Sequence, residues 1–281
     1  MGKFINNDQT VEPSAQLTEF LSSKTALIIL TGAGISVSSG IPTYRDTNGI
    51  WQRSEPIQHQ AFLAEPRSRQ RYWLRSYNGW PLIKDAQPTI SHHAIARLEQ
   101  AGTSFLTVTQ NVDGLHQKAG SRKIIDLHGK INEVICMDCQ NLTSRAELQT
   151  RLAYLGDKAP GITKMAPDGD ADIEDRYIED VVIPECLNCG GMLKPNVVFF
   201  GDNVDRNIVN AIYSALDDAD GLLIVGTSLK VFSGYRFCRY AAEKRIPIGS
   251  VNPGISRGDD LISTRIKAPA DDVFRRWTDQ Y

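Results

Sequence analysis

Four cysteines stand in two closely spaced pairs that could hold a metal ion. Cys136 and Cys139 form one C-x-x-C unit, and Cys186 and Cys189 form the other, with 46 residues between the units. Four thiolates suit a tetrahedral Zn²⁺ ion, and a site with four protein ligands leaves no open position for catalysis. The pairs therefore favour a structural zinc site. Free cysteines or a redox pair are the alternative that the spacing leaves open.

Glycines and polar residues follow directly after several apolar runs. These stretches are TGAGIS (31–36), TQNVDGLH (109–116), GTSLKV (226–231) and VNPG (251–254). Ligands of open α/β sheets bind at the carboxyl ends of the strands, and small residues such as Gly32 and Gly34 let the backbone approach a pyrophosphate at the start of a helix. Taken alone, the G-A-G turn is a weak signal, because a tight turn that binds nothing has the same pattern.

Two histidines are candidates for a general base. His128 follows the apolar run KIIDL (123–127), and His116 ends the stretch TQNVDGLH. An imidazole in such a place can take up a proton near neutral pH. A purely structural, hydrogen-bonded histidine is the alternative for each, and the spacing does not choose between the two residues.

These residues need a scaffold of alternating strands and helices. Helical spacing of apolar residues predicts helices over 92–102 and 207–220. Near-continuous apolar runs are typical of parallel strands buried on both faces. We therefore predict an α/β fold with a Rossmann-type, doubly wound parallel sheet. Its expected strands are TALIIL (25–30), SFLTVT (104–109), KIIDL (123–127), NVVFF (196–200), GLLIVG (221–226) and IPIGSV (246–251).

Two stretches break this alternation and indicate smaller modules. Residues 46–88 contain no good strand and are expected to be helical. Residues 130–195 hold both cysteine pairs and an acidic loop, and a unit of this size needs a metal to hold it together. The Rossmann domain is then expected to comprise 15–45, 89–129 and 196–275, with residues 1–14 forming a flexible N-terminus.

The composition is that of an ordinary globular protein. The chain has 281 residues, of which 41% are hydrophobic and 23% charged, and a formal net charge of −2. This charge argues against nucleic-acid and membrane partners, and the acidic segment between the cysteine pairs argues against a nucleic-acid-binding ribbon. The sequence shows neither a secretory signal nor a run long enough to cross a bilayer, so we expect a cytoplasmic protein.

Taken together, the motifs resemble those of the sirtuins, and in particular their class II branch. The resemblance covers about residues 15–275 and is carried by the two C-x-x-C pairs with GAGISVSSGIPTYRD, TQNVDGLH, LHG, KPNVVFFGDN, GTSL and VNPG, in the family's order. It implies an NAD-binding Rossmann domain with a smaller zinc-ribbon and helical domain. It also implies NAD-dependent removal of acyl groups from protein or peptide lysines, which yields nicotinamide, O-acyl-ADP-ribose and free lysine.

The resemblance also implies roles for individual residues. His128 would deprotonate a ribose hydroxyl, while Asn111 and Asp113 would hold the nicotinamide amide and a nearby water. The acyl-lysine would lie along Val198, Phe199 and Gly201. The cysteine quartet would hold one structural zinc per chain. The implied contacts with NAD are Gly32, Ala33, Gly34, Ser36, Tyr44, Arg45, Trp51, Gln110, Asn111, Asp113, Gly226, Thr227, Ser228, Asn252, Pro253, Gly254 and Ala270.

Two features bear on specificity. Sirtuins often have Asp-Phe-Arg after Gly-Ile-Pro, whereas this chain has Thr43-Tyr44-Arg45, which puts a phenol where a phenyl ring is usual. Tyr72 and Arg75 are three residues apart and can share a helical face. In sirtuins that remove dicarboxylic acyl groups, a similar Tyr-x-x-Arg pair grips the distal carboxylate. We therefore hypothesise that acyl groups larger than acetyl are accepted; ordinary packing residues are the alternative.

Other functions would use the same NAD site. Mono-ADP-ribosyl transfer is one, and an NAD-sensing binding module with a zinc ribbon for partner contact is another. His128, together with Asn111 and Asp113, disfavours a mere sensor. A dehydrogenase is disfavoured because no acidic residue follows a second strand to grip the adenosine ribose.

Overall fold

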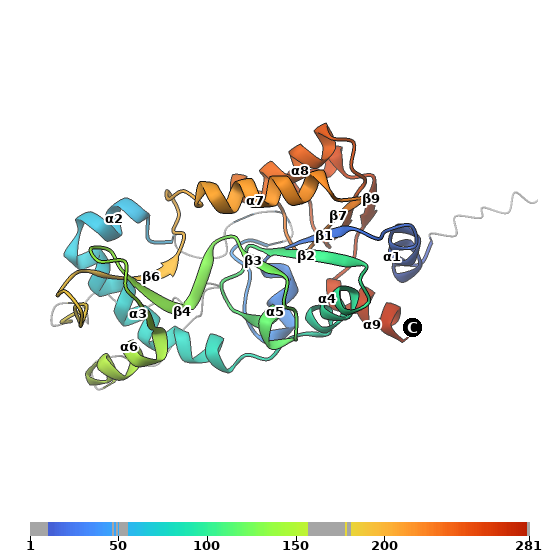
Figure 1. The fold of residues 1–281 in the computed structure, drawn as a ribbon. Coiled ribbons are helices and arrows are strands. Elements are labelled where there is room, and N and C mark those ends of the chain that lie inside the picture. Colours follow the sequence, from blue (N-terminus) through green and yellow to red (C-terminus); the bar gives the residue numbers. More distant parts are fainter. Residues whose placement is uncertain are drawn as a thin grey trace, which may run out of the picture.

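The computed structural model describes residues 11–46, 48, 50, 56–156, 178 and 181–279. It has two lobes (Figure 1), each built around its own sheet. The larger lobe contains a six-stranded sheet in which all neighbouring strands are parallel, and the smaller lobe contains a three-stranded antiparallel sheet.

The order of strands in the larger sheet is that of a Rossmann fold. The sheet reverses its winding between β1 and β7, and such a switch point leaves a crevice at the carboxyl ends of the strands. The predicted fold class is therefore confirmed. In sheet order the strands are β3 (Ile124–Asp126), β2 (Ser104–Thr109), β1 (Leu27–Thr31), β7 (Gly221–Val225), β8 (Ile248–Val251) and β9 (Thr264–Ile266).

Both faces of this sheet are covered by helices, which explains why its central strands, β1 and β7, are apolar and buried along nearly their whole length. In β1, Leu27 and Ile29 face one hydrophobic core while Ile28 and Leu30 face another. The first core is closed by α1 (Pro13–Leu21), α4 (Ile90–Gln100) and α9 (Ala270–Thr278), and the second by α7 (Arg206–Asp217) and α8 (Phe232–Glu243), which lie on the opposite side in Figure 1.

The helices begin where side chains can cap them. The Thr89 side chain accepts from the backbone N–H of His92, and the His92 side chain accepts from the N–H of Thr89, a reciprocal cap for α4. The Asp205 carboxylate accepts from the N–H of Asn207 and starts α7. Helix α1 begins at Pro13, so residues 13 and 14, expected to belong to a flexible N-terminus, are helical.

The smaller lobe corrects one expectation about the strands. The run NVVFF (196–200) was expected in the parallel sheet, but β6 (Leu193–Val197) pairs antiparallel with β4 (Gly129–Cys136) in the smaller sheet. An apolar run indicates burial and does not identify the partner strand, which is why the assignment was wrong. The lobe is completed by β5 (Leu142–Ser144), α2 (His59–Ala64), α3 (Pro66–Asp85), α6 (Arg145–Arg151) and the 3-10 turn η2 (Ala153–Leu155).

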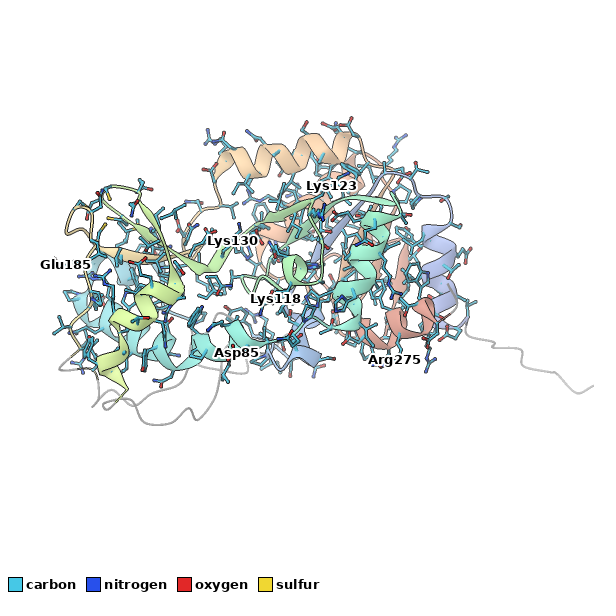
Figure 2. The ribbon with its side chains drawn as sticks, turned by 60° about the horizontal axis from the view of Figure 1, so that its bottom comes forward. Asp85, Lys118, Lys123, Lys130, Glu185 and Arg275 are labelled. Atoms are coloured by element: carbon cyan, nitrogen blue, oxygen red, sulfur yellow. The ribbon has the colours of Figure 1, made fainter. Side chains whose placement is uncertain are left out.

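Buried contacts join the two lobes. A shared hydrophobic cluster contains Ile83 from α3 and Ile131 from β4 of the smaller lobe, together with Val112, which follows β2 of the larger lobe. Beside it, α5 (Leu115–Lys118) is tied to the end of α3, because the Lys118 Nζ donates to the carbonyl oxygens of Lys84 (2.5 Å) and Ala86 (2.9 Å). Figure 2 shows Lys118 near the end of α3, where Asp85 is labelled. No helix among the described residues is both long and apolar enough to cross a membrane.

Candidate functional site

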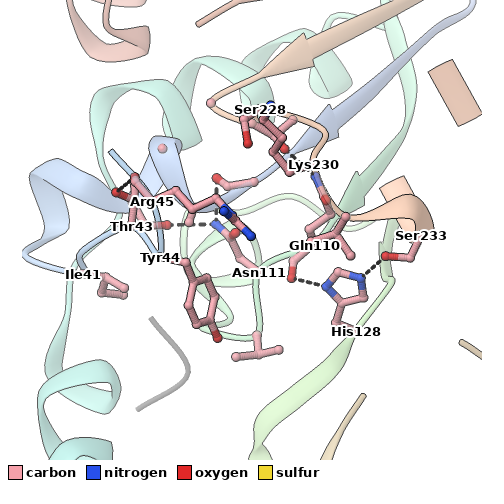
Figure 3. A pocket seen from close by; sticks show the side chains of 18 of the residues that line it. Ile41, Thr43, Tyr44, Arg45, Gln110, Asn111, His128, Ser228, Lys230 and Ser233 are labelled. Carbon is pink, nitrogen blue, oxygen red and sulfur yellow. Dashed lines mark hydrogen bonds between the residues drawn. The ribbon is translucent and has the colours of Figure 1, made fainter. Parts of the chain in front are cut away.

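A pocket of about 850 Å³ lies at the switch point of the large sheet and extends to the smaller lobe (Figure 3). The turns after β1, β2, β7 and β8 form its wall on the side of the large lobe, and His128 follows β3. A volume of this size is typical of a site for a small molecule or cofactor. Four sequence motifs that are far apart in the chain therefore meet in one cavity.

The glycine turn after β1 is packed tightly against the turn after β7. The Gly34 N–H donates to the Gly226 carbonyl oxygen (2.8 Å), and a Cβ at position 34 would lie 2.7 Å from that oxygen. Gly226 has a φ of +63°, which favours glycine. The helix that follows is the 3-10 helix η1 (Ala33–Ser39), so the expected α-helix N-terminus is not present here.

The stretch after β2 forms a hydrogen-bonded row inside the pocket. The Gln110 Nε2 donates to the Thr227 Oγ1 (3.0 Å), and the Asn111 Nδ2 donates to the Ser36 Oγ (3.1 Å). The Ser36 hydroxyl in turn donates to a carboxylate oxygen of Asp113 (2.8 Å). Burial raises the pKa of Asp113, whose residue is 3% exposed. This network holds the three side chains of the Gln-Asn-x-Asp stretch in defined orientations before any ligand binds.

His128 lies beside this stretch, and both of its ring nitrogens are hydrogen-bonded (Figure 3). Nδ1 lies 2.9 Å from the carbonyl oxygen of Gln110 and Nε2 lies 2.7 Å from the Ser233 Oγ. A carbonyl oxygen can only accept, so in the neutral ring Nδ1 carries the proton and Nε2 is the acceptor. Burial lowers the pKa of His128 to about 4, and its imidazole is therefore neutral at pH 7.

His116, the competing candidate for the base, lies elsewhere. It is 1% exposed, its Nε2 is 2.9 Å from the Thr31 Oγ1, and its ring centroid is 4.8 Å from that of the buried His92. Among the described residues the pocket wall includes His128 and does not include His116. The geometry therefore favours His128 as the residue that could exchange a proton with a ligand.

Aromatic rings form the end of the pocket in the smaller lobe. The Phe199 ring centroid lies 5.2 Å from those of Tyr72 and Phe62. Tyr72 lines the pocket together with Val198, Phe199 and Gly201, whereas Arg75, one helical turn further along α3, is not part of the lining. Trp51 lies outside the residues that the structure describes.

Every other predicted contact with NAD lines this cavity. These residues are Gly32, Ala33, Gly34, Ser36, Tyr44, Arg45, Gln110, Asn111, Asp113, Gly226, Thr227, Ser228, Asn252, Pro253, Gly254 and Ala270. The lining also includes residues that the motifs did not indicate, among them Phe232, Ser233 and Arg236 at the start of α8. The stretch GTSLKV ends just before them, so following that strand-end turn into the next helix would have found them.

The four paired cysteines meet at the end of the smaller sheet. The Cys136 and Cys189 Sγ atoms are 3.5 Å apart, those of Cys139 and Cys186 are 3.8 Å apart, and all four lie within 4.8 Å of one another. These distances are too long for disulfides. A tetrahedral zinc with Zn–S bonds of about 2.3 Å separates its sulfurs by about 3.8 Å. The cluster therefore has the donor atoms and the spacing that Zn²⁺ requires.

Comparison with known proteins assigns the chain to a family. The model of the Sir2 family matches residues 32–233, which include Gly32 and Gly34, TQNVDGLH (109–116), GTSLKV (226–231) and both cysteine pairs. The chain belongs to the Sir2 family. It is 45% identical to the "NAD-dependent protein deacetylase" of Bordetella bronchiseptica over 95% of this chain and 98% of that relative. It is 44% identical to the "NAD-dependent protein deacylase Sirt4" of Drosophila melanogaster over 94% of this chain and 86% of that relative.

Solved Sir2 structures share the whole fold. A structure described as "Sir2-p53 peptide-NAD+" aligns with a TM-score of 0.77 and 25% identity, covering 94% of this chain and 97% of the other. Another, described as a "Sir2 H116A-deacetylated p53 peptide-3'-o-acetyl ADP ribose" complex, aligns with a TM-score of 0.77 over 95% of this chain. The Sir2 resemblance found in the sequence is thus confirmed.

Proposed function

We propose that this chain is an NAD-dependent protein lysine deacylase that yields nicotinamide, O-acyl-ADP-ribose and free lysine. The observation that carries the proposal is the position of the neutral His128 ring in the wall of the switch-point pocket. Its Nδ1 is bonded to the Gln110 carbonyl oxygen, and its Nε2 to the hydroxyl of Ser233, which also lines the pocket. The Sir2 relatives whose names state this activity support it over nearly the full length of the chain.

The residues of the pocket fit NAD as co-substrate. The glycine turn at Gly32 and Gly34 leaves backbone and no side chain at the crevice where a pyrophosphate binds in this fold. Asn111 and Asp113 are held in place through Ser36, so they can bind the nicotinamide amide and a water without first reorganising. Bound NAD would supply a ribose carbon that the acyl oxygen attacks as the bond from that carbon to nicotinamide breaks.

Within that complex the protein's own groups orient the reactants and move a proton. The acyl-lysine lies along Val198, Phe199 and Gly201, where the aromatic wall excludes water. The unprotonated Nε2 of His128, which bonds to Ser233 in this structure, would take the proton of a ribose hydroxyl, and the oxygen of that hydroxyl could then attack the acyl carbon. Nδ1–H keeps its hydrogen bond to Gln110 while the ring carries the added charge.

The cysteine cluster serves the fold and not the reaction. Cys136, Cys139, Cys186 and Cys189 would hold one zinc ion, and four thiolate ligands leave it no site for substrate. The ion would pin the end of β4 to the segment that leads into β6.

The deciding experiment is mass spectrometry of an acyl-peptide panel incubated with NAD. Wild-type protein should release free lysine and O-acyl-ADP-ribose, and His128→Ala should not. Isotope-labelled NAD adds a control, because label that remains on protein would indicate ADP-ribosyl transfer. An inactive wild type, or a His128→Ala variant with wild-type activity, would refute the proposal.

Acceptance of acyl groups larger than acetyl remains our hypothesis. Tyr72 lies in the aromatic end of the pocket, which supports a role in acyl binding, whereas Arg75 is outside the lining and would have to turn inward. If Arg75 grips a distal carboxylate, Arg75→Ala should lower kcat/KM for succinyl peptide by about tenfold or more, the size expected of a lost charge-assisted hydrogen bond. Equal losses on acetyl and succinyl peptides would contradict the hypothesis.

The cytoplasmic location, and the absence of nucleic-acid and membrane partners, stay predictions from the sequence. The proposed macromolecular substrate is an acylated lysine in a protein or peptide. Support comes from the peptide complexes among the Sir2 structures that this chain resembles.

A further inference from the structure

One hydrogen bond at the site has no counterpart in the proposed reaction. The Ser233 hydroxyl, in the first turn of α8, lies 2.7 Å from the Nε2 of His128, 105 residues away in sequence. Because Nδ1 carries the ring proton, the hydroxyl is the donor and Nε2 the acceptor. The serine therefore occupies the lone pair that the proposed base step requires.

The serine is available for this contact because it does not cap its own helix. Serines near a helix start commonly bond to free backbone N–H groups. In α8 the N-cap residue is Val231, and no side chain caps the helix. Ser233 is half-buried and lines the pocket, so its hydroxyl is directed at the imidazole.

The start of α8 is held close to the ring by a second contact. A Cβ at Gly234 would lie 2.6 Å from the side-chain oxygen of Gln110, so only glycine lets the helix approach this closely. Gln110 is also the residue whose carbonyl oxygen accepts from the Nδ1 of His128. The turn after β2 therefore bonds to one ring nitrogen and the start of α8 to the other. Both hydrogen bonds depend on the close packing of Gly234 against Gln110.

We propose that Ser233 is a positioning residue for His128, which fixes the imidazole as the Nδ1–H tautomer with Nε2 directed into the pocket until the ribose hydroxyl takes the serine's place. This inference rests on the proposed deacylase function. It assigns Ser233 to the second chemical step, in which the proton moves, and not to the earlier loss of nicotinamide.

The hydrogen bond from Ser233 is the local contact that could change the pKa of the His128 ring, because no charged side chain in the described part of the chain is hydrogen-bonded to the ring. The charged groups around the ring include Asp113, Asp126, Lys130, Lys194, Lys230 and Arg236, but the two hydrogen bonds of the imidazole both go to uncharged groups. A hydroxyl that donates to Nε2 favours the neutral ring. Its removal should therefore raise the pKa of His128 by about half to one pH unit.

The first test reads the ring directly and needs no activity. Nitrogen NMR of ¹⁵N-histidine-labelled protein, with the His128 signal identified by its loss in His128→Gln, should show the Nδ1–H tautomer. In Ser233→Ala the titration of this signal should move up by about half to one pH unit, and in Ser233→Thr it should stay near the wild-type value. Ser214→Ala, an exposed serine on α7, is the matched control.

The second test separates the two chemical steps. Exchange of labelled nicotinamide into NAD reports the first step, and O-acyl-ADP-ribose formation reports the second. Ser233→Ala should keep the exchange rate and lose about three- to tenfold in product formation, with the acid limb of its pH profile shifted up. Ser233→Thr should recover the product rate.

An unchanged His128 titration in Ser233→Ala, an Nε2–H tautomer in the wild type, or a product rate equal to that of Ser214→Ala would overturn the inference. Failure of the proposed function would look different. No variant, the wild type included, would then form product, while the NMR titration would still report whether Ser233 acts on the ring.

Discussion

Gly34 shows how a single residue determines the shape of the pocket. A methyl group there would lie 2.7 Å from the carbonyl oxygen of Gly226, and neither turn can move without shifting its strand. We expect Gly34→Ala to cost about 1–3 kcal/mol of folding free energy, as overpacking of a tight site does, and to raise the KM for NAD. Thermal unfolding and NAD titration measure the two effects. A variant with the Tm and KM of Ser214→Ala would contradict the packing argument.

Buried histidines make folding stability depend on pH. Burial lowers the pKa of His92 to about 3 and that of His116 well below its usual range, whereas in the unfolded chain both titrate near 6.5. The unfolded state therefore binds more protons between these values. The contribution of these histidines to the free energy of unfolding is fully present above about pH 6.5. It is lost as the pH falls, by up to about 1.4 kcal/mol per pH unit for each histidine.

Urea unfolding at pH 7.5, 6.5 and 5.5 measures this slope. His116→Phe removes one titrating ring and should flatten the slope, although it lowers stability at pH 7.5 by removing the hydrogen bond to Thr31. Ser214→Ala, an exposed and non-titrating exchange on α7, should leave the slope unchanged. A His116→Phe slope equal to that of wild type would show that this ring is not the source.

Most of the residues that line the pocket could be predicted from the sequence, because polar side chains that follow apolar strands are not explained by packing in the core. Gln110, Asn111 and Thr227 could be predicted in this way. Ser233 could not, because its significance depends on a hydrogen bond between a helix start and a histidine 105 residues away. Spacing in sequence also could not choose between His116 and His128, which only the packing of the two rings separates.

At the scale of elements, the smaller sheet depends on its metal-binding end. The central strand β4 ends in Cys136, and the segment that carries Cys186 and Cys189 leads into β6, so the cluster closes both strands. Structural zinc contributes about 10–16 kcal/mol of binding free energy in small peptides. We expect Cys186→Ser to lose the zinc and to unfold the smaller sheet at a lower temperature than wild type.

Metal analysis and calorimetry test this expectation together. Wild-type protein should contain one zinc per chain, and the Cys186→Ser variant should contain none. Cys238→Ala is the matched control, because this buried fifth cysteine lies in α8 away from the cluster. Full zinc content in Cys186→Ser, or loss of zinc in Cys238→Ala, would refute the assignment of ligands.

Strands were easier to predict than their partners. The five apolar runs of the parallel sheet were found because burial on both faces makes them apolar throughout. The run at 196–200 is also apolar, but its first two residues belong to β6, which pairs with β4 through backbone groups that every residue carries. Strand β9 was missed because it has only three residues, two of them Thr264 and Arg265.

At the scale of the molecule, the two lobes act together through a buried junction. Ile131 on β4 is fully buried in the cluster that also contains Ile83 of α3 and Val112 beyond β2. Ile131→Ala should cost about 2–5 kcal/mol and raise the KM for acyl peptide, because the wall carrying Phe199 would lose its fixed distance from His128.

Ile212→Ala provides the matched comparison. Ile212 lies on α7 in the core of the large lobe and is 1% exposed. Its substitution truncates the same type of side chain at a place away from the junction. It should lower stability by a similar amount and leave the peptide KM unchanged. Denaturant unfolding and steady-state kinetics decide the matter, and equal KM values for the two variants would argue against coupling through the junction.

The walls of the pocket are drawn from nearly the whole chain, from Gly32 to Asp271. During synthesis, a nascent chain that ends before Asn252 lacks one side of the crevice, and α9, which begins at Ala270 in the lining, is made later still. Turnover of NAD must therefore wait until the chain has been made as far as α9. An incomplete chain therefore does not consume NAD, because parts of the binding site are translated late.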